Sequence, residues 1–293
     1  MFNIDIIDSK TTLGESGFYL YKSNEIVFLD IINPTIFFYS LNSRKLIKHK
    51  LKLTKPLGNI YPLDNDFFLI SCLTGLFYFN RSTKKLKKFI DIRKKNEIEK
   101  LNYNDGTISK NKIWIGLSHI KENKDLGYFG YLYKKKFYVV DRKFKVSNGP
   151  AIDEKSNSLY FSDSFKSSIY KYNLKNFKKK ILINFEKKHG FPDGLALDNN
   201  YGLWVAHWGG SKITRINLNN GRIDQEIKIP ALNVTSVTFV GKKLDHLFVT
   251  TANFELTKNQ MKKFNHSGSS FIFKTNYQGI KVPYSDLKYN NGN

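Results

Sequence analysis

Short apolar runs recur along this chain at a nearly constant spacing. They are rich in β-branched and aromatic residues, which favours strands over helices. The runs are IVFLD from Ile26, FFLIS from Phe67, IWIGL from Ile113, LYFSD from Leu159, LWVAH from Leu203 and LFVTT from Leu247. Equivalent positions in successive runs are 41 to 46 residues apart. The pattern therefore indicates six copies of one structural unit.

Each unit continues with a turn, a second apolar strand, a polar turn and then a third strand. The fifth unit shows this order in LWVAH, KITRIN, NLNNG and RIDQEIKI. Such spacing is typical of a β-propeller with about four strands per blade. A sandwich of many short strands is the alternative, but it does not require even spacing.

We therefore predict an all-β fold, a six-bladed β-propeller forming a single domain over residues 1–293. The N-terminal segment NIDII is expected to complete the last blade, so that pairing of the N- and C-terminal segments closes the ring and hides free sheet edges. The best helix candidate is LTKNQMKKF over residues 256–264.

Composition narrows the class of protein. Hydrophobic residues make up 41% of the 293 and aromatic residues 15%, which is ample for a buried core. The formal net charge of +23 invites a nucleic-acid interpretation, but the lysines fall in short groups at predicted outer turns, so we expect no nucleic-acid partner. The one cysteine, Cys72, and the lack of a leader or a long apolar run predict a cytoplasmic protein with no membrane partner.

Polar residues occupy one offset in the repeat. Ten to twelve positions before the aligned strand residue stand Glu15, Asn104, Asn148, Asp193 and Ser236, whereas the second unit offers only Gly58 and Asn59. A propeller places equivalent positions at equal height around its central channel. These side chains are therefore expected to meet there.

Two carboxylates and one or two amide oxygens make an anionic, oxygen-rich pocket. A divalent cation would remove the repulsion between the carboxylates, and oxygen ligands favour Ca²⁺, Mg²⁺ or Mn²⁺, although Zn²⁺ also accepts carboxylate oxygen. The alternative is that Glu15, Asn148 and Asp193 are turn and cap residues that bind backbone N–H groups. The shared offset favours the cation site.

Several stretches of the chain, in the same order, resemble the family of regucalcin (senescence marker protein), gluconolactonase and related sugar lactonases over nearly its whole length. The stretches are LGESGFY, NYNDG, SNGPAIDEKSNSLYFSDS, FPDGLALDNNYGLWVAHWGGSKITRIN and NVTSVTFVGKKLDHLFVTTA. The resemblance implies a six-bladed propeller with one divalent cation in its channel, held here by Glu15, Asn148 and Asp193. It also implies that Asn104 contacts the substrate or a water, and that Asn102 stands where some members use an arginine to hold the substrate.

The resemblance implies hydrolysis of a small sugar lactone, with the cation polarising the carbonyl and Asp193 as the best candidate general base. His119 and His207 lie at or just beyond the ends of their apolar runs and could contact substrate, although His207 could equally pack beside Trp208. A non-catalytic calcium- or ligand-binding propeller of the regucalcin type is the second hypothesis, and a basic scaffold for acidic partners is the third. We expect a monomer or a small homo-oligomer.

Overall fold

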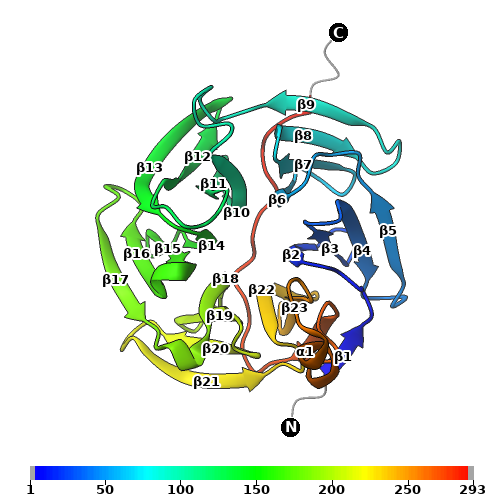
Figure 1. The fold of residues 1–293 in the computed structure, drawn as a ribbon, viewed down its shortest axis with the longest axis vertical. Helices are drawn as coiled ribbons and strands as arrows, with labels where there is room; N and C mark the ends of the chain where they lie inside the picture. The colour runs from blue at the N-terminus through cyan, green and yellow to red at the C-terminus, as the bar shows by residue number, and fades with distance from the viewer. Residues whose placement is uncertain (1–3, 290–293) are drawn as a thin grey trace.

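Six four-stranded antiparallel sheets form a closed ring in the computed structural model, which describes residues 4–289 (Figure 1). The blades follow the six repeats, so the predicted six-bladed propeller is confirmed. In each blade the apolar run that defines the repeat is the second strand from the channel, and nearly all of its residues are buried.

The strands of each blade follow one another outward from the channel. Blade 1 contains β2 (Gly14–Leu20), β3 (Glu25–Asp30), β4 (Thr35–Ser40) and β5 (Leu46–Lys50). Blade 2 contains β6 (Leu57–Pro62), β7 (Phe67–Cys72), β8 (Gly75–Asn80) and β9 (Leu86–Ile90). Blade 3 contains β10 (Leu101–Ser109), β11 (Lys112–His119), β12 (Gly127–Tyr133) and β13 (Lys136–Phe144).

The remaining blades have the same order. Blade 4 contains β14 (Ser147–Asp153), β15 (Ser158–Asp163), β16 (Ser168–Asn173) and β17 (Lys179–Asn184). Blade 5 contains β18 (Phe191–Leu197), β19 (Gly202–Trp208), β20 (Lys212–Asn217) and β21 (Arg222–Lys228). Blade 6 contains β22 (Asn233–Val240), β23 (His246–Ala252), β24 (Ser270–Lys274) and, outermost, β1 (Ile4–Ile7).

Aromatic side chains fill the spaces between blades. Phe28 of blade 1 lies 5.2 Å from Phe248 of blade 6 between ring centroids, and Phe129 of blade 3 stacks on Phe161 of blade 4 at 4.0 Å. The last blade is closed by β1, which pairs antiparallel with β24 from Ile4 opposite Phe273. This confirms the predicted pairing of the two ends of the chain.

Helical structure is scarce and lies in connecting loops. The α1 helix (Lys258–Lys263) falls within the predicted helical segment and begins with a capping box between Thr257 and Gln260. Two short 3-10 helices are η1 (Ser164–Lys166) and η2 (Lys187–His189). Among the described residues, no helix combines the length and apolar character needed to cross a bilayer.

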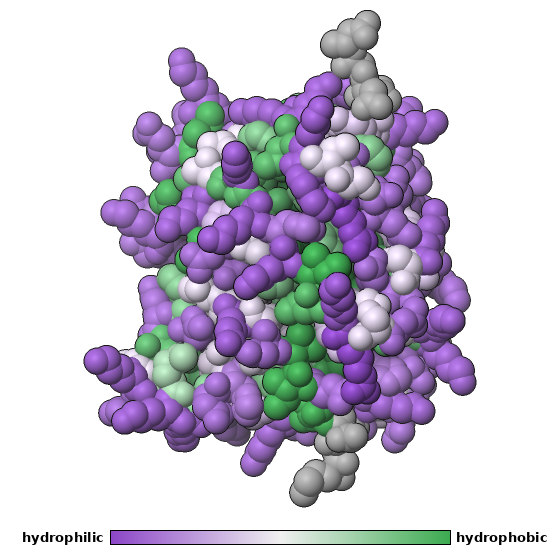
Figure 2. Space-filling view, turned by 90° about the vertical axis from the view of Figure 1, so that its right-hand side faces the viewer, coloured by the Kyte–Doolittle hydropathy of each residue, from purple (hydrophilic) through white to green (hydrophobic). Residues whose placement is uncertain are grey.

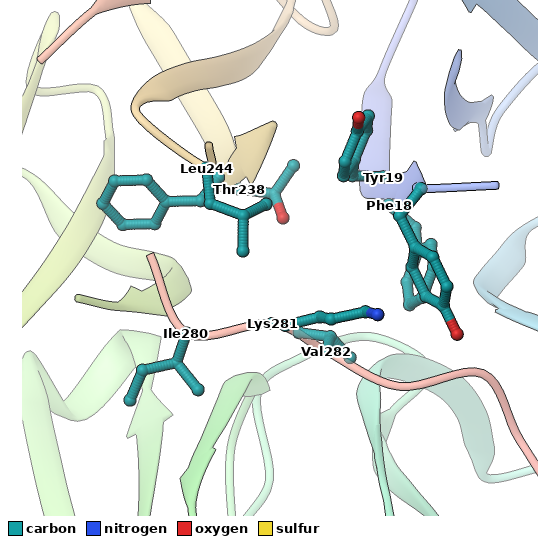
Figure 3. A pocket seen from close by; sticks show the side chains of 9 residues that line it. Phe18, Tyr19, Thr238, Leu244, Ile280, Lys281 and Val282 are labelled. Atoms are coloured by element: carbon teal, nitrogen blue, oxygen red, sulfur yellow. The ribbon is translucent and has the colours of Figure 1, made fainter. Parts of the chain in front are cut away.

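Residues 275–289 leave blade 6 and cross one end of the ring, which we call the far end (Figure 1, red trace). The backbone N–H of Ile280 donates to Leu197 O at 2.9 Å, and that of Ser285 donates to Pro62 O at 2.9 Å. Figure 3 shows Ile280, Lys281 and Val282 facing Phe18, Tyr19 and Thr238 across a small pocket beneath this tail. Because Leu197 and Pro62 lie where inner strands end, the opposite end of the channel is where inner strands begin, and we call it the site end.

Hydrophilic residues cover most of the side of the ring seen in Figure 2, with a hydrophobic band through its middle. The outermost strands of blades 1 to 4 carry many of the lysines, as in LIKHK of β5 and KKILIN of β17. Lysines on such strands discourage pairing with another sheet. The basic composition is therefore consistent with protection of the exposed strand edges.

Candidate functional site

A register shift interrupts every inner strand close to the offset that carries the polar residues. The shifts lie between Glu15 and Phe18, Leu57 and Ile60, Tyr103 and Gly106, Asn148 and Ala151, Pro192 and Leu195, and Val234 and Ser236. A β-bulge of this kind leaves residues out of the ladder and turns their side chains in a new direction. The polar residues therefore stand at the bulges because there the inner strands can direct them away from the blade.

Asn104 and Asn148 link blades 3 and 4 at the site end. The Asn104 amide Nδ2 donates to Asn148 Oδ1 at 2.6 Å and to the carbonyl of Ser147 at 2.8 Å. Asn148 Nδ2 donates to Ser164 Oγ at 2.9 Å, and Ser164 Oγ donates to the carbonyl of Pro192 at 2.7 Å. This chain of hydrogen bonds connects Asn104 of blade 3, through Asn148, to the residue that precedes Asp193.

Asp105 belongs to the same region, although the repeat offset did not select it. Its carboxylate accepts hydrogen bonds from Gly106 N at 2.7 Å, Gly149 N at 2.8 Å and Asn59 Nδ2 at 2.6 Å. The pKa of Asp105 is raised to about 6 by burial. Since these donors come from blades 2, 3 and 4, Asp105 holds three inner strands together. Its place beside Asn104 in the repeat was the signal that could have identified it.

Glu15 and Asp193 are carboxyl groups whose surroundings disfavour their ionised form. Burial, and then the Asp105 carboxylate, raise the pKa of Glu15 well above its usual range. Burial, and then Glu15 and Asp105, raise the pKa of Asp193 in the same way. Within residues 4–289 no lysine, arginine or histidine forms an ion pair with either carboxylate. Both groups are therefore the kind of carboxyl whose ionised form a bound cation would favour.

The residues at the site end can be compared with the ligands that a divalent cation prefers. Among the described residues, no group of three or more His, Cys, Asp and Glu side chains is placed to hold a metal ion. Asp105 is engaged by its three donors, and Asn148 Oδ1 accepts one hydrogen bond from Asn104, so the available set is the carboxylates of Glu15 and Asp193 with the remaining lone pair of the Asn148 amide oxygen. Two carboxylates and a neutral amide oxygen fit a hard divalent cation. The assignment of these three residues as ligands stays a prediction.

The two asparagines and the first histidine predicted to contact substrate lie at the site end of blade 3. Asn102 Oδ1 is buried and has no hydrogen-bond partner, and the same holds for His119 Nδ1. Asn102 pairs with Ser118 and lies two residues before Asn104, which stands at the register shift of β10. A bound molecule could satisfy the free oxygen of Asn102.

The structure contradicts the predicted substrate contact of His207. Its side chain is fully buried on β19, its Nε2 lies 2.7 Å from Thr214 Oγ1 on β20, and its ring packs edge-on against Phe185. The prediction was wrong because a strand end was taken to lie at the channel mouth, whereas this residue faces the interior of its blade. Burial lowers the pKa of His207 to about 3, so the ring is neutral.

Glu122 is a site-end residue that the repeat pattern could not reveal. It lies in the loop after β11, and its charge also contributes to the raised pKa of Asp193, after burial, Glu15 and Asp105. The segment lies outside the repeated strands, where no equivalent position in another blade points to it. Ser236, the last member of the offset series, instead forms a hydrogen bond with Thr250 at 2.8 Å.

Comparison with known proteins identifies a family and a set of relatives. The sequence model described as "SMP-30/Gluconolactonase/LRE-like region" matches residues 13–253. A Bacillus subtilis protein provisionally named a sugar lactone lactonase is 22% identical, covering 95% of this chain and 97% of its own. Regucalcin of Danio rerio is 23% identical, covering 96% of each chain. The crystal structure of a calcium-binding regucalcin from Agrobacterium tumefaciens superposes with a TM-score of 0.89 at 20% identity, covering 96% and 97% of the two chains.

Proposed function

The chain belongs to the SMP-30/gluconolactonase/LRE-like family, and from that membership we propose that it is a divalent-metal-dependent hydrolase of a small lactone of the sugar-lactone class. One observation carries the proposal. Burial and neighbouring carboxylates raise the pKa of both Glu15 and Asp193, at the same end of the channel where Asn104 and Asn148 meet. A relative named as a sugar lactone lactonase supports the substrate class.

Glu15, Asn148 and Asp193 would hold the cation, which when bound supplies Lewis-acid polarisation of the lactone carbonyl. Asp193 would accept a proton from the attacking water as the general base. The water oxygen bonds to the carbonyl carbon, the ring C–O bond breaks, and the proton passes from Asp193 to the departing ring oxygen. The product is the open-chain hydroxy acid.

Asn104 and Asn102 would orient the substrate. Both hydrogen-bond contacts made by Asn104 use Nδ2, which leaves its Oδ1 to accept from a hydroxyl or from the attacking water. Asn102 Oδ1 is a second acceptor on β10, without a hydrogen-bond partner among the described residues. His119 Nδ1, buried at the end of β11, is a further polar atom without a hydrogen-bond partner among the described residues. The buried, unpaired Cys72 supports an intracellular location as part of the proposal.

A lactone panel tests this function. Acid release is followed with glucono-δ-lactone and related lactones in Ca²⁺, Mg²⁺, Mn²⁺ and Zn²⁺ in turn, for the wild type and for Asp193→Ala. We expect cation-dependent turnover by the wild type, and loss of both cation binding and turnover in the variant. Retained lactonase activity in cation-free Asp193→Ala protein would contradict the assignment.

A catalytically silent cation-binding propeller is the second candidate, because a solved relative is described as a calcium-binding regucalcin. The same panel separates the two functions. A protein that binds one cation but hydrolyses no lactone in any of the four metals would support the second candidate. In that case Asp193→Ala should still lose the cation.

A further inference from the structure

Large apolar side chains are exposed at the site end, where the predicted substrate enters. Phe165 of η1 is 43% exposed and Phe191 at the start of β18 is 38% exposed. Their ring centroids lie 5.3 Å apart in an edge-on arrangement. Exposed phenylalanines gain nothing from water and have no polar atom to solvate. Two of them in contact at the site end therefore form an apolar surface that we expect a ligand to cover.

Both rings stand on segments that carry predicted ligands. Phe191 lies two residues before Asp193 at the start of β18, next to the register shift between Pro192 and Leu195. Phe165 follows Ser164, whose hydroxyl accepts from Asn148 Nδ2 and donates to Pro192 O. Phe191 is thus close in sequence to Asp193. Phe165 is adjacent to Ser164, which hydrogen-bonds to Asn148.

The neighbouring loop of blade 3 extends this apolar rim. Lys166 of η1 pairs with Asp125 at 3.2 Å, which holds the loop between β11 and β12 against η1. Ile120 and Leu126 of that loop are 42% and 46% exposed. The loop follows His119, which pairs with Leu101 at the start of β10, so it begins at the site end.

We infer that the substrate is amphipathic, with a polar lactone ring at Asp193 and Asn148 and an apolar substituent against Phe165 and Phe191. The inference rests on the proposed function and specifies its substrate class. A substituent of about five carbon atoms spans the distance along β18 from Asp193 to Phe191. Phenylalanine edges offer no hydrogen bond to sugar hydroxyls, so an alkyl or acyl group suits them better than a second polyhydroxylated ring.

Two lactones that differ by one pentyl group provide the test. The ratio of kcat/KM for δ-decalactone to that for δ-valerolactone is measured for the wild type, Phe165→Ala, Phe191→Ala and the double variant. We expect the wild-type ratio to be about tenfold or more, because each methylene that enters an apolar site adds discrimination. The ratio should fall toward one in the double variant and remain high in Phe191→Leu.

Ile181→Ala is the matched control, since Ile181 is 54% exposed on the outer strand β17 of blade 4, away from the channel. It should keep the wild-type ratio. A wild-type ratio near one, or a high ratio that survives in the double variant, would overturn the inference. Loss of self-association in the double variant at an unchanged ratio would also overturn it and make the rings a contact between copies of the chain.

A binding measurement distinguishes failure of the hydrolase proposal from failure of the apolar subsite. If no lactone is hydrolysed, calorimetry compares 2-pentyltetrahydropyran with tetrahydropyran, two cyclic ethers that cannot react. Tighter binding of the pentyl compound, lost in the double variant, would support the apolar subsite although the hydrolase proposal had failed. Equal affinity for the two ethers would refute the subsite.

Discussion

At the scale of single residues, Glu15 and Asp193 are the groups that the fold alone does not explain. Buried carboxylates normally find a cationic partner, because an unpaired buried charge is costly. Here burial raises the pKa of both groups, followed by the charge of Asp105 for Glu15 and the charges of Glu15 and Asp105 for Asp193. Residues of this kind are retained for function at the expense of stability.

Neutral variants should therefore stabilise the cation-free protein. Asp193→Asn and Glu15→Gln are each expected to raise the free energy of unfolding by about 1–2 kcal/mol at pH 7, because each removes one member of a repelling pair. The measurement is urea unfolding in the presence of a chelator. Glu186→Gln, on the exposed Glu186, is the control and should leave the free energy of unfolding close to that of the wild type. Lower stability in both site variants would argue that these carboxylates are structural caps.

His207 should make stability depend on pH. Its pKa falls from 6.5 to about 3 on folding, so between these values the unfolded state binds more protons. The contribution of His207 to the free energy of unfolding is fully present above about pH 6.5 and is lost as the pH falls toward 3. At pH 5 the loss amounts to about 2 kcal/mol. His207→Gln, which retains a polar group beside Thr214, should show a smaller loss between pH 7 and pH 5 in denaturant unfolding. Parallel pH profiles for the two proteins would contradict the buried, neutral histidine.

At the scale of elements, the bulge in each inner strand explains why the site lies where it does. A regular strand alternates its side chains between two blade faces, whereas an interrupted ladder can turn a side chain toward the axis. Asp105 stabilises these interruptions by accepting from the backbone of Gly106 and Gly149 and from Asn59. The inner strands thus depend on one carboxylate that is not a predicted ligand.

Asp105→Ala should destabilise the protein by about 2–3 kcal/mol, because it leaves two buried N–H groups and one amide without an acceptor. Asp105→Asn should cost less, since one oxygen remains to accept. Thermal and denaturant unfolding of both variants provide the measurement. If neither variant lowered the free energy of unfolding, the role assigned to Asp105 in joining blades 2, 3 and 4 would be wrong.

The repeat was sufficient to predict the elements but not every contact between them. Even spacing of apolar runs predicted six blades, and the apolar NIDII segment predicted closure, because both follow from strand periodicity alone. Asp105 was overlooked because a bulge brings two consecutive residues into the same region. Glu122 lies in a loop that no other blade repeats. His207 was misplaced because sequence alone does not say which way a residue at a strand end faces.

At the scale of the whole molecule, the channel has two unlike ends. The tail over residues 275–289 crosses the far end, where Tyr284 stacks on Tyr21 at 4.4 Å and donates to Asn65 Oδ1 at 2.7 Å. Glu15, Asn148 and Asp193 lie at the opposite end, at the starts of their inner strands. A ligand would therefore enter from the site end, and the tail would act on stability only.

Removal of the tail tests whether it contributes to stability alone or also to cation binding. Truncation after Thr275 should lower the free energy of unfolding by about 3 kcal/mol or more, because it exposes the apolar surface beneath Tyr284 and deletes the hydrogen bonds of Ile280 and Ser285. Differential scanning calorimetry measures the loss. Well below the lowered melting temperature, cation affinity should match that of the full chain. Loss of cation binding in a folded truncated protein would place the tail in the site.

Isothermal calorimetry of cation binding tests the central claim most directly, with chelator-treated protein titrated in turn with Ca²⁺, Mg²⁺, Mn²⁺ and Zn²⁺. We predict one bound cation per chain for at least one of these metals, lost in Glu15→Gln and in Asp193→Asn and retained in Glu186→Gln. Binding that persists in both site variants, or no binding of any of the four cations by the wild type, would contradict a cation site at the start of the inner strands.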